Sequence, residues 1–444
     1  MKKVTLWMVA VTTMISLPCI SIKAMEVNKT PSAVVEEDTT TMNLSLKEAQ
    51  DYAVQHNRSL ENAGLDIKKA EAAHWQAIAT MLPQVNAKID YSNMCGYEMD
   101  FSGQTISMPP SGQIVASSSM SFSGAQVVNV QIAKISERMA DVTKKKSEKE
   151  IRDNIKLLYY TALVTEKTVG LLEENLKSLE DLLRFSNKSV EMGVSEQVDA
   201  DQIMVQVSSM KSSINSTKRS LEAVYNSLRL QLDLDVDKNI KLTQTIDDLL
   251  NVESALSLLR LDFIVNDNYS YQLLEQSAEI SRKKVNIAEW SFAPSFTVGY
   301  SYTKKEYFSD EPTFNMTPPN MFSMSISIPI FSSGTRYKAL QSAQYDYQMS
   351  VNTLTDTEKS LQMQHRQLCY NLNSSFEKYQ IQKENVDVTQ RLFNNMAKKY
   401  EYGTASGVDI TTSGTNVIQS QNTYIQSLLD FVNSQIQLET LLNR

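Results

Sequence analysis

The sequence has few of the residues that end secondary-structure elements. Its 444 residues include 12 Gly and 10 Pro, less than half of the usual combined share of about 12%. Turns depend on these residues, so the elements must be few and long. No Pro lies within 111–293 or after Pro329, and long Pro-free stretches of Ala, Leu, Gln, Glu, Lys and Ser favour helix.

Signatures of chemistry are also absent. The three histidines are His56, His74 and His365. None lies in a metal-ligand spacing, and there is no phosphate-binding or dinucleotide-binding glycine motif. In the segment GTASG (403–407), Ala405 stands where a nucleophile elbow needs Ser. Cys95 and Cys369 lie in unrelated contexts. We therefore expect no enzyme, no catalytic residue, no cofactor and no metal site.

The first residues are typical of an export signal. Lys2 and Lys3 precede an apolar run that ends near Leu17, and 22–24 resembles a small-residue cleavage site. We expect a signal peptide over 1–24 and a disordered leader over 25–42. Later apolar runs are too short for a transmembrane helix. Without the signal the net charge is −11, which argues against binding to nucleic acid, whose phosphates attract basic residues.

The chain contains an internal duplication. Asn57 to Pro83 recurs 211 positions later as Asn268 to Pro294. Further along, the offset is a constant 210 for matched pairs: Gly124 and Gly334, Gly193 and Gly403, Asp199 and Asp409. Such regular spacing indicates two tandem repeats. We assign repeat 1 to 43–232, repeat 2 to 266–444, and an unmatched insert to 233–265.

Each repeat follows one order of elements. A helix ends at the Pro, and in repeat 1 it begins with a capping box formed by Ser45 and Glu48. Two short strands follow, separated by an irregular loop (92–113 or 303–320). Long helical runs over 125–192 and 335–402 then end at a Gly, and a second helix of about 35 residues returns.

The strands alternate apolar and polar residues. They are expected over 84–91, 114–122, 295–302 and 322–330. The last is the clearest, because its odd-numbered positions hold Ser or Pro and its even-numbered positions hold Phe, Met or Ile. One such strand also suits a soluble sheet packed on one side. Four of them, in duplicated pairs of an exported chain, favour a membrane barrel with a wet interior.

Four strands cannot close a membrane barrel by themselves, because open edges in lipid leave backbone groups unpaired. The barrel must then be shared between chains. Two copies would contribute eight strands and three copies twelve. The open edges therefore require an oligomer but do not fix its size.

Three segments carry a family resemblance. Residues 44–85, 328–347 and 400–410, the last reading YEYGTASGVDI, resemble the corresponding parts of the TolC-type outer-membrane efflux proteins. The resemblance implies a mainly α homotrimer with a small transmembrane β part. Its twelve-stranded β-barrel would continue into an α-barrel of long antiparallel helices across the periplasm of a Gram-negative bacterium. The insert (233–265) would be the belt around the tunnel. Partner proteins would open the far end of this tunnel.

The candidate functional residues lie at the two helical turns. Gly193 and Gly403 would mark the periplasmic tip, and Asp199 and Asp409 would start the returning helices. In a trimer each aspartate would form a ring that attracts cations, although acids at a helix start are also favoured by the helix dipole. By family position, Tyr400 pairs with Asp199 to hold the tip closed. Tyr400→Phe or Asp199→Ala should then raise single-channel conductance.

The sequence thus predicts a passive exit duct in a tripartite efflux or type I secretion system. A periplasmic adaptor (membrane fusion) protein would dock at its tip, and an inner-membrane pump, proton-driven or ATP-driven, would supply energy. The alternative is a periplasmic coiled-coil adaptor or scaffold that never enters a membrane. Adaptors have one helical hairpin between β-domains, whereas here the helical unit occurs twice with strands at its centre.

Overall fold

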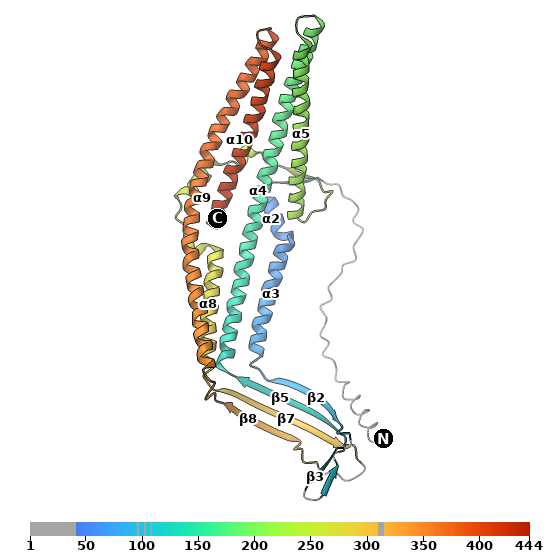
Figure 1. The fold of residues 1–444 in the computed structure, drawn as a ribbon, viewed down its shortest axis with the longest axis vertical. Coiled ribbons are helices and arrows are strands. Elements are labelled where there is room, and N and C mark those ends of the chain that lie inside the picture. The colour runs from blue at the N-terminus through green and yellow to red at the C-terminus, as the bar shows by residue number, and fades with distance from the viewer. Residues whose placement is uncertain (1–40, 96, 102–103, 108, 310–314) are drawn as a thin grey trace. The chain divides into compact units, whose positions relative to one another are not determined.

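The computed structural model describes residues 41–95, 97–101, 104–107, 109–309 and 315–444 (Figure 1). The expected signal peptide (1–24) and almost all of the expected leader (25–42) lie outside them. The described chain divides into two compact units. The first contains 70–136 and 279–348, and the second contains 41–69, 137–278 and 349–444.

Four long helices dominate the chain. α4 (Gly124–Glu191) has 68 residues and α9 (Thr335–Glu401) has 67, while the returning helices α5 (Gln197–Gln231) and α10 (Gly407–Leu441) have 35 each. The predicted runs and return helices are therefore confirmed. α5 lies along α4 in the second unit (Figure 1), where Lys211 and Lys218 of α5 pair with Glu180 and Glu173 of α4 at 2.8 and 2.7 Å.

The first helical segment of each repeat is shorter than expected. In repeat 1 it is divided into α2 (Leu46–His56) and α3 (Arg58–Ala79), and α3 ends before Pro83. The Ser45–Glu48 capping box is confirmed at the start of α2. The division falls at Asn57, which adopts an extended conformation and accepts the N–H of Ser59 on its side chain. Asparagine offers the backbone this alternative to a continuing helix.

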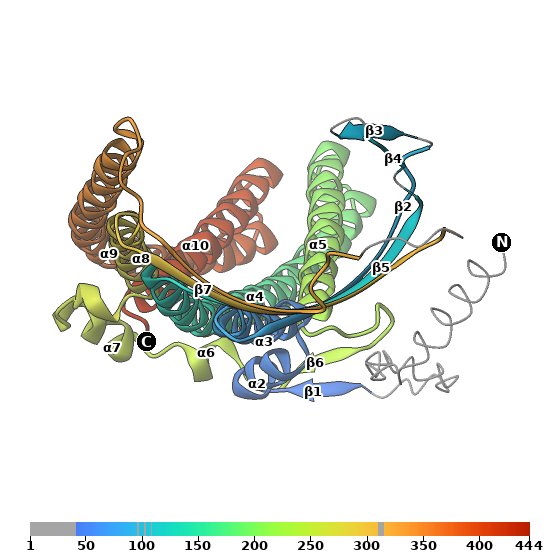
Figure 2. The same ribbon diagram turned by 90° about the horizontal axis from the view of Figure 1, so that it is seen from below.

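In the first unit, four antiparallel strands form one sheet in the order β2-β5-β7-β8. The strands are β2 (Gln84–Ser92), β5 (Ser111–Phe122), β7 (Ser295–Tyr307) and β8 (Asn320–Ser327). All four predicted strands are present. β8 ends before Pro329, which has no N–H to donate to a partner strand, so the prediction was wrong over 328–330. Figure 2 shows the curvature of this sheet.

The strand register places most of the apolar side chains on one face. Val298 of β7 pairs with Met324 of β8, and Ser301 pairs with Met321 on the alternate face. The apolar face carries Val85, Ile89, Tyr91, Ile114, Met120, Phe122, Phe296, Val298, Tyr300, Tyr302, Phe322, Met324 and Ile326. In the Ser-rich strand β5, Ser117, Ser119 and Ser121 fall on the other face, while Ser118 lies on the apolar face opposite Tyr300.

Three features differ from the sequence analysis. β7 continues to Tyr307, into the loop expected over 303–320. The loop expected to be irregular over 92–113 contains the paired strands β3 (Glu98–Phe101) and β4 (Gln104–Ser107). In the second unit, β1 (Met42–Leu44) pairs in parallel with β6 (Ile240–Leu242) of the insert. Met42, the last residue of the expected disordered leader, therefore lies in a strand. Pairing between segments so far apart leaves no local sequence signal.

The rest of the insert consists of short helices. They are α6 (Ile246–Leu249), α7 (Val252–Ser257), η1 (Leu258–Arg260) and η2 (Val265–Asp267), followed by α8 (Tyr269–Trp290), the first helix of repeat 2. Ile246, Ala255 and Leu258 are buried in the same apolar core as Phe431 of α10. The insert is thus packed into the middle of the second unit.

Candidate functional site at the helical turns

The two helix-to-helix turns have the same backbone geometry. Gly193 and Gly403 both have a φ of 72°, a left-handed conformation that suits glycine. The N–H of Gly193 donates to the carbonyl of Val190 at 2.9 Å, and the N–H of Gly403 donates to the carbonyl of Tyr400 at the same distance. Both turns lie in the second unit, and each glycine is at the position that the sequence predicts.

Asp409 caps its own helix. Its carboxylate accepts the backbone N–H of Ser406 at 2.9 Å and the Ser406 hydroxyl at 2.8 Å, and the Ser406 side chain in turn accepts the N–H of Asp409. Asp409 is exposed. The two bonds from Ser406, the backbone bond first, stabilise the ionised form and hold the pKa of Asp409 below its ordinary value.

Asp199 contacts the other repeat. It lies in the first turn of α5, but the N-cap of that helix, Glu196, has no side-chain capping bond. Instead, Oδ1 of Asp199 accepts the backbone N–H of Gly407, the first residue of α10, at 3.1 Å. The carboxylate of one repeat therefore satisfies a helix-start donor of the other, which would otherwise have no partner within its helix.

Tyr400 also links the two repeats, through a different partner from the one expected. Its side chain is buried, its hydroxyl lies 2.8 Å from Oγ of Ser186 on α4, and its ring meets the ring of Phe185 edge-on. The expected Tyr400–Asp199 pair is not formed within the described chain. The last turn of α9 faces α4, whereas the first turn of α5 faces α10, so the two residues reach different helices.

An apolar core joins all four helices beside the turns. It contains Leu172, Leu179, Leu182, Ile203, Val207, Met210, Ile214, Phe393, Tyr400, Ile410 and Val417. Ile203 of α5 and Ile410 of α10 are fully buried. The cross-repeat hydrogen bonds of Asp199 and Tyr400 are therefore made beside a packed apolar core.

A second pair of equivalent positions lies just before α3 and α8. The side chain of Asn57 caps α3 and donates to the carbonyl of Gln231 at the end of α5. In repeat 2, Oδ1 of Asn268 accepts the N–H groups of Ser270 and Tyr271, while its Nδ2 donates to Leu441 at the end of α10. We call these two places the asparagine joints. They tie α3 to α5 in repeat 1 and α8 to α10 in repeat 2.

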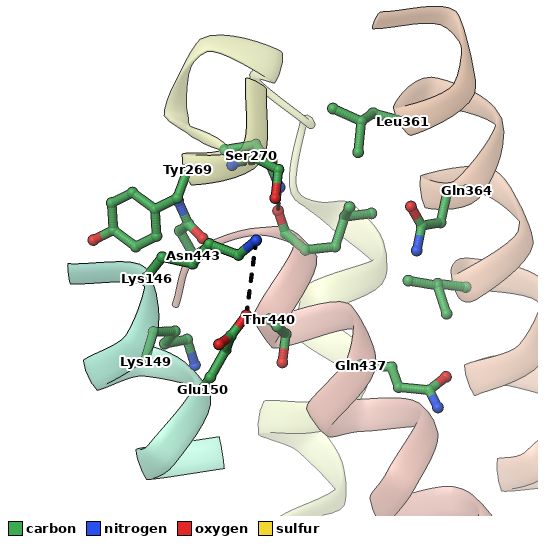
Figure 3. Close-up of a pocket in the computed structure, with 13 residues that line it drawn as sticks. Lys146, Lys149, Glu150, Tyr269, Ser270, Leu361, Gln364, Gln437, Thr440 and Asn443 are labelled. Atoms are coloured by element: carbon green, nitrogen blue, oxygen red, sulfur yellow. Dashed lines mark hydrogen bonds and ion pairs between the residues drawn. The ribbon is translucent and has the colours of Figure 1, made fainter. Parts of the chain in front are cut away.

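A cavity of about 360 Å³ lies beside the Asn268 joint. Figure 3 shows residues of α4, α8, α9 and α10 around it. Its lysines are paired within α4: Lys146 lies 3.8 Å from Glu150, and Lys149 donates to Asp153 at 2.6 Å. Because both cations are paired, we assign no ligand to this cavity.

Comparison with known proteins identifies the family of this chain. The family profile described as outer membrane efflux protein matches residues 50–232 and 270–444. The chain belongs to the outer membrane efflux protein family. This confirms the resemblance to the TolC-type proteins and places the chain at the outer membrane. The family is one of efflux proteins rather than enzymes.

Individual relatives are distant in sequence. Two proteins of Pseudomonas putida, the probable efflux pump outer membrane protein TtgC and the antibiotic efflux pump outer membrane protein ArpC, are each 22% identical over 291 residues, or 63% of this chain. The chain spans 57% of the length of each.

Solved structures share the fold. The outer membrane protein VceC from Vibrio cholerae has a TM-score of 0.72 and 16% identity, with 89% of this chain and 95% of VceC covered. The CmeC channel of Campylobacter jejuni has a TM-score of 0.73 and 14% identity, with 89% and 85% covered. These likenesses confirm the predicted fold class for the single chain.

In this family member, no described helix has the length and apolar character needed to cross a membrane. Within the described residues, no three His, Cys, Asp or Glu side chains are grouped to hold a metal ion. Cys95 and Cys369 are both free thiols.

The partners of the turn residues have no clear signal in the sequence, with one exception. The capping box of Ser406 and Asp409 was readable, because Ser and an acid three residues apart precede a helix. Ser186 and Gly407 had no such signal, because their roles depend on helices from different repeats. The gate assignment of Asp199, Asp409 and Tyr400 stays a prediction.

The lowered pKa of Asp409 predicts an acid-sensitive contribution to stability. A carboxylate whose pKa is lower when folded stabilises the protein above the unfolded-state pKa, about 3.9 for aspartate. This contribution is lost as the pH falls through the lower, folded-state value. The difference in melting temperature between the unmodified protein and Asp409→Ala should be constant from pH 5 to 7 (about one unit above that pKa and beyond) and shrink below about pH 4. Ser406→Ala removes the hydroxyl bond to Asp409. In that background, adding Asp409→Ala should change the melting temperature by less than it does in the unmodified protein. A difference of full size well below pH 3, about one unit under the unfolded-state pKa, would contradict the prediction.

Proposed function

We propose that three copies of this chain form the exit duct of a tripartite efflux or type I secretion system. The sheets would combine into a twelve-stranded barrel in the outer membrane, in contact with lipid. The long helices would form a tunnel in the periplasm. The duct is passive and performs no catalysis, so a pump in the inner membrane supplies the energy and a periplasmic adaptor opens the tip.

The observation that carries this proposal is the four-stranded sheet. Its register gathers aromatic and aliphatic side chains on one face, and exposed residues such as Phe322 (70%) and Met324 (63%) have no covering layer in the single chain. Among the described strands, β2 and β8 each pair on one side only. An apolar face needs lipid or protein against it, and unpaired edges in lipid need partner strands.

The edges suggest how copies join. If β8 of one copy pairs with β2 of the next, three copies close the sheet with no edge remaining. Three rather than two copies follow the family resemblance. The insert over 233–265 would form the belt around the tunnel, supported by its packing against α10.

The tip residues support a gate. Asp409 stays ionised over the neutral range, and three copies would bring three such carboxylates together at a narrow mouth. A ring of this kind concentrates cations. The relatives TtgC and ArpC are described as outer membrane proteins of efflux pumps, which supports efflux over a scaffold role. The cargo would be chosen by the pump.

Membrane fractionation tests the proposal. We expect a detergent-dependent, heat-modifiable trimer in the outer membrane that forms channels in planar lipid bilayers. A soluble periplasmic monomer would instead support the adaptor or scaffold alternative and end the duct proposal.

A further inference from the structure

One face of α9 carries a stripe of exposed apolar side chains. In the second unit, the large apolar residues of α9 that are exposed are Met349, Met363, Tyr370, Ile381, Val388 and Leu392. At about 100° per residue, all six fall within about 60° of one another around the helix. Single apolar residues on a surface are ordinary, but a continuous stripe along a helix is a packing face. In the single chain this packing face is exposed.

The internal duplication shows what this face of α9 should pack against. The 210-residue offset matches α9 with α4 and α10 with α5. Within the chain, α4 contacts α10, where Nδ2 of Asn175 donates to Gln421 at 2.9 Å. We call this contact the internal interface. Its equivalent would join α9 to the α5 of another copy, because the chain has a single repeat 1, which already meets repeat 2. We call it the intercopy interface.

The internal interface contains a polar network around Asp153 of α4. This residue is buried, with 7% of its surface exposed. Its Oδ1 accepts a hydrogen bond from Nζ of Lys149 at 2.6 Å, and its Oδ2 accepts the hydroxyl of Thr440 on α10 at 2.6 Å. A buried carboxylate needs such partners on both oxygens. The hydroxyl of α10 therefore completes a site that α4 alone leaves unfinished.

The equivalent positions of the intercopy interface are apolar. The offset matches Asp153 with Met363 of α9, and it matches Thr440 with Leu230 of α5. Met363 is 70% exposed and Leu230 is 77% exposed in the single chain. The two positions that meet across the internal interface have thus both changed from polar to apolar. A contact between them in the intercopy interface would bury both side chains.

A neighbouring ion pair differs between the two interfaces in the same way. Lys156 pairs with Glu439 across the internal interface at 2.6 Å. The offset replaces Lys156 with Arg366, and it replaces the glutamate with a second cation, Arg229. Arg229 is paired instead with Glu222 of its own helix at 2.7 Å. The intercopy interface therefore does not repeat the polar chemistry of the internal one.

We propose that Met363 of one copy packs against Leu230 of the next copy, and that the two different interfaces fix the alternating order of repeats 1 and 2 around the tunnel. This inference rests on the proposed function, in which three copies share one tunnel. If repeat 1 met repeat 1 of another copy, Asp153 would face Leu230 and lose the hydroxyl of Thr440. The polar network within the chain and the apolar contact between copies thus disfavour the wrong pairing.

Rebuilding the polar network between copies tests this assignment. Met363→Asp places a carboxylate against Leu230, so subunits should exchange between labelled trimers about tenfold faster, which corresponds to about 1.4 kcal/mol. Adding Leu230→Thr supplies the hydroxyl, and Lys359, the counterpart of Lys149, supplies the cation. The double variant should then return to within about threefold of the unmodified protein. Gln362→Asp, the matched control, adds the same charge at an exposed neighbour outside the stripe and should leave exchange unchanged.

Cross-linking tests the contact itself, without relying on conduction. With Cys95 and Cys369 replaced by Ser, a short thiol cross-linker should join copies of Met363→Cys/Leu230→Cys into covalent trimers. Leu392→Cys/Leu230→Cys is the control for register, because Leu392 lies on the same stripe about 44 Å further along α9. This control should remain monomeric on a denaturing gel.

The outcomes separate this inference from the proposed function. If the copies cross-link through Met363 and Leu230 but no preparation conducts, the duct proposal fails and the intercopy interface stands. If trimers conduct but this pair does not cross-link, or Leu230→Thr does not rescue Met363→Asp, the intercopy interface is wrong and the duct stands. A monomer in every preparation would overturn both.

Discussion

Met324→Arg should abolish assembly in the outer membrane, whereas Ser325→Arg at the adjacent position should be tolerated. Met324 lies in the middle of β8, opposite Val298 on the apolar face, and its side chain is 63% exposed in the single chain. A cationic side chain facing lipid near the midplane costs about 2–4 kcal/mol. Three copies would each bear that cost. The measurement is the amount of heat-modifiable trimer in the outer-membrane fraction.

Ser325 is the matched control because strand neighbours point to opposite faces. It pairs with Thr297 on the polar face, which the proposal turns toward the wet interior. Ser325→Arg should therefore form trimers at the normal level and change only the conductance or ion selectivity. Equal trimer levels for both variants would mean that the apolar face does not meet lipid, and the barrel proposal would be lost.

Much of this fold could be predicted from the sequence because its repeating patterns are local. The alternation in 322–327 directly reports one strand with two different faces, and the absence of Gly and Pro from 335–402 reports one continuous helix. The break at Asn57 could not be predicted this way, because it depends on the side chain of Asn57 capping the next helix. The pairing of β1 with β6 joins segments about 200 residues apart, and no local pattern records it.

The candidate site was predicted in place but not in its contacts. Gly193 and Gly403 were found because a left-handed turn after a long helix favours glycine. The partners of Asp199 and Tyr400 depend on which helices of the two repeats meet, and this is a property of packing. Gly407 shows the limit clearly: its sequence context looks like any helix start, and only its distance from Asp199 explains it.

The second large effect is expected at the Asn268 joint. Asn268 is buried and makes three hydrogen bonds, two that cap α8 and one to Leu441 at 3.1 Å. Asn268→Ala loses the cap, at about 0.5–2 kcal/mol, and leaves the Leu441 carbonyl without this donor, at about 1–3 kcal/mol. The free energy of local opening should therefore fall by about 1.5–5 kcal/mol. Amide exchange in the first turn of α8 and the last turn of α10 measures it.

Asn268→Asp divides the two contributions within one residue. It keeps the oxygen that caps α8 and loses the donor to Leu441, so exchange should accelerate at the end of α10 and stay slow at the start of α8. Asn57→Ala should produce the corresponding loss in repeat 1, at α3 and the end of α5, because Asn57 makes the equivalent bonds to Ser59 and Gln231. If Asn268→Asp left the end of α10 as protected as before, the joint would be only a helix cap. The asparagines would then not tie α3 to α5 or α8 to α10.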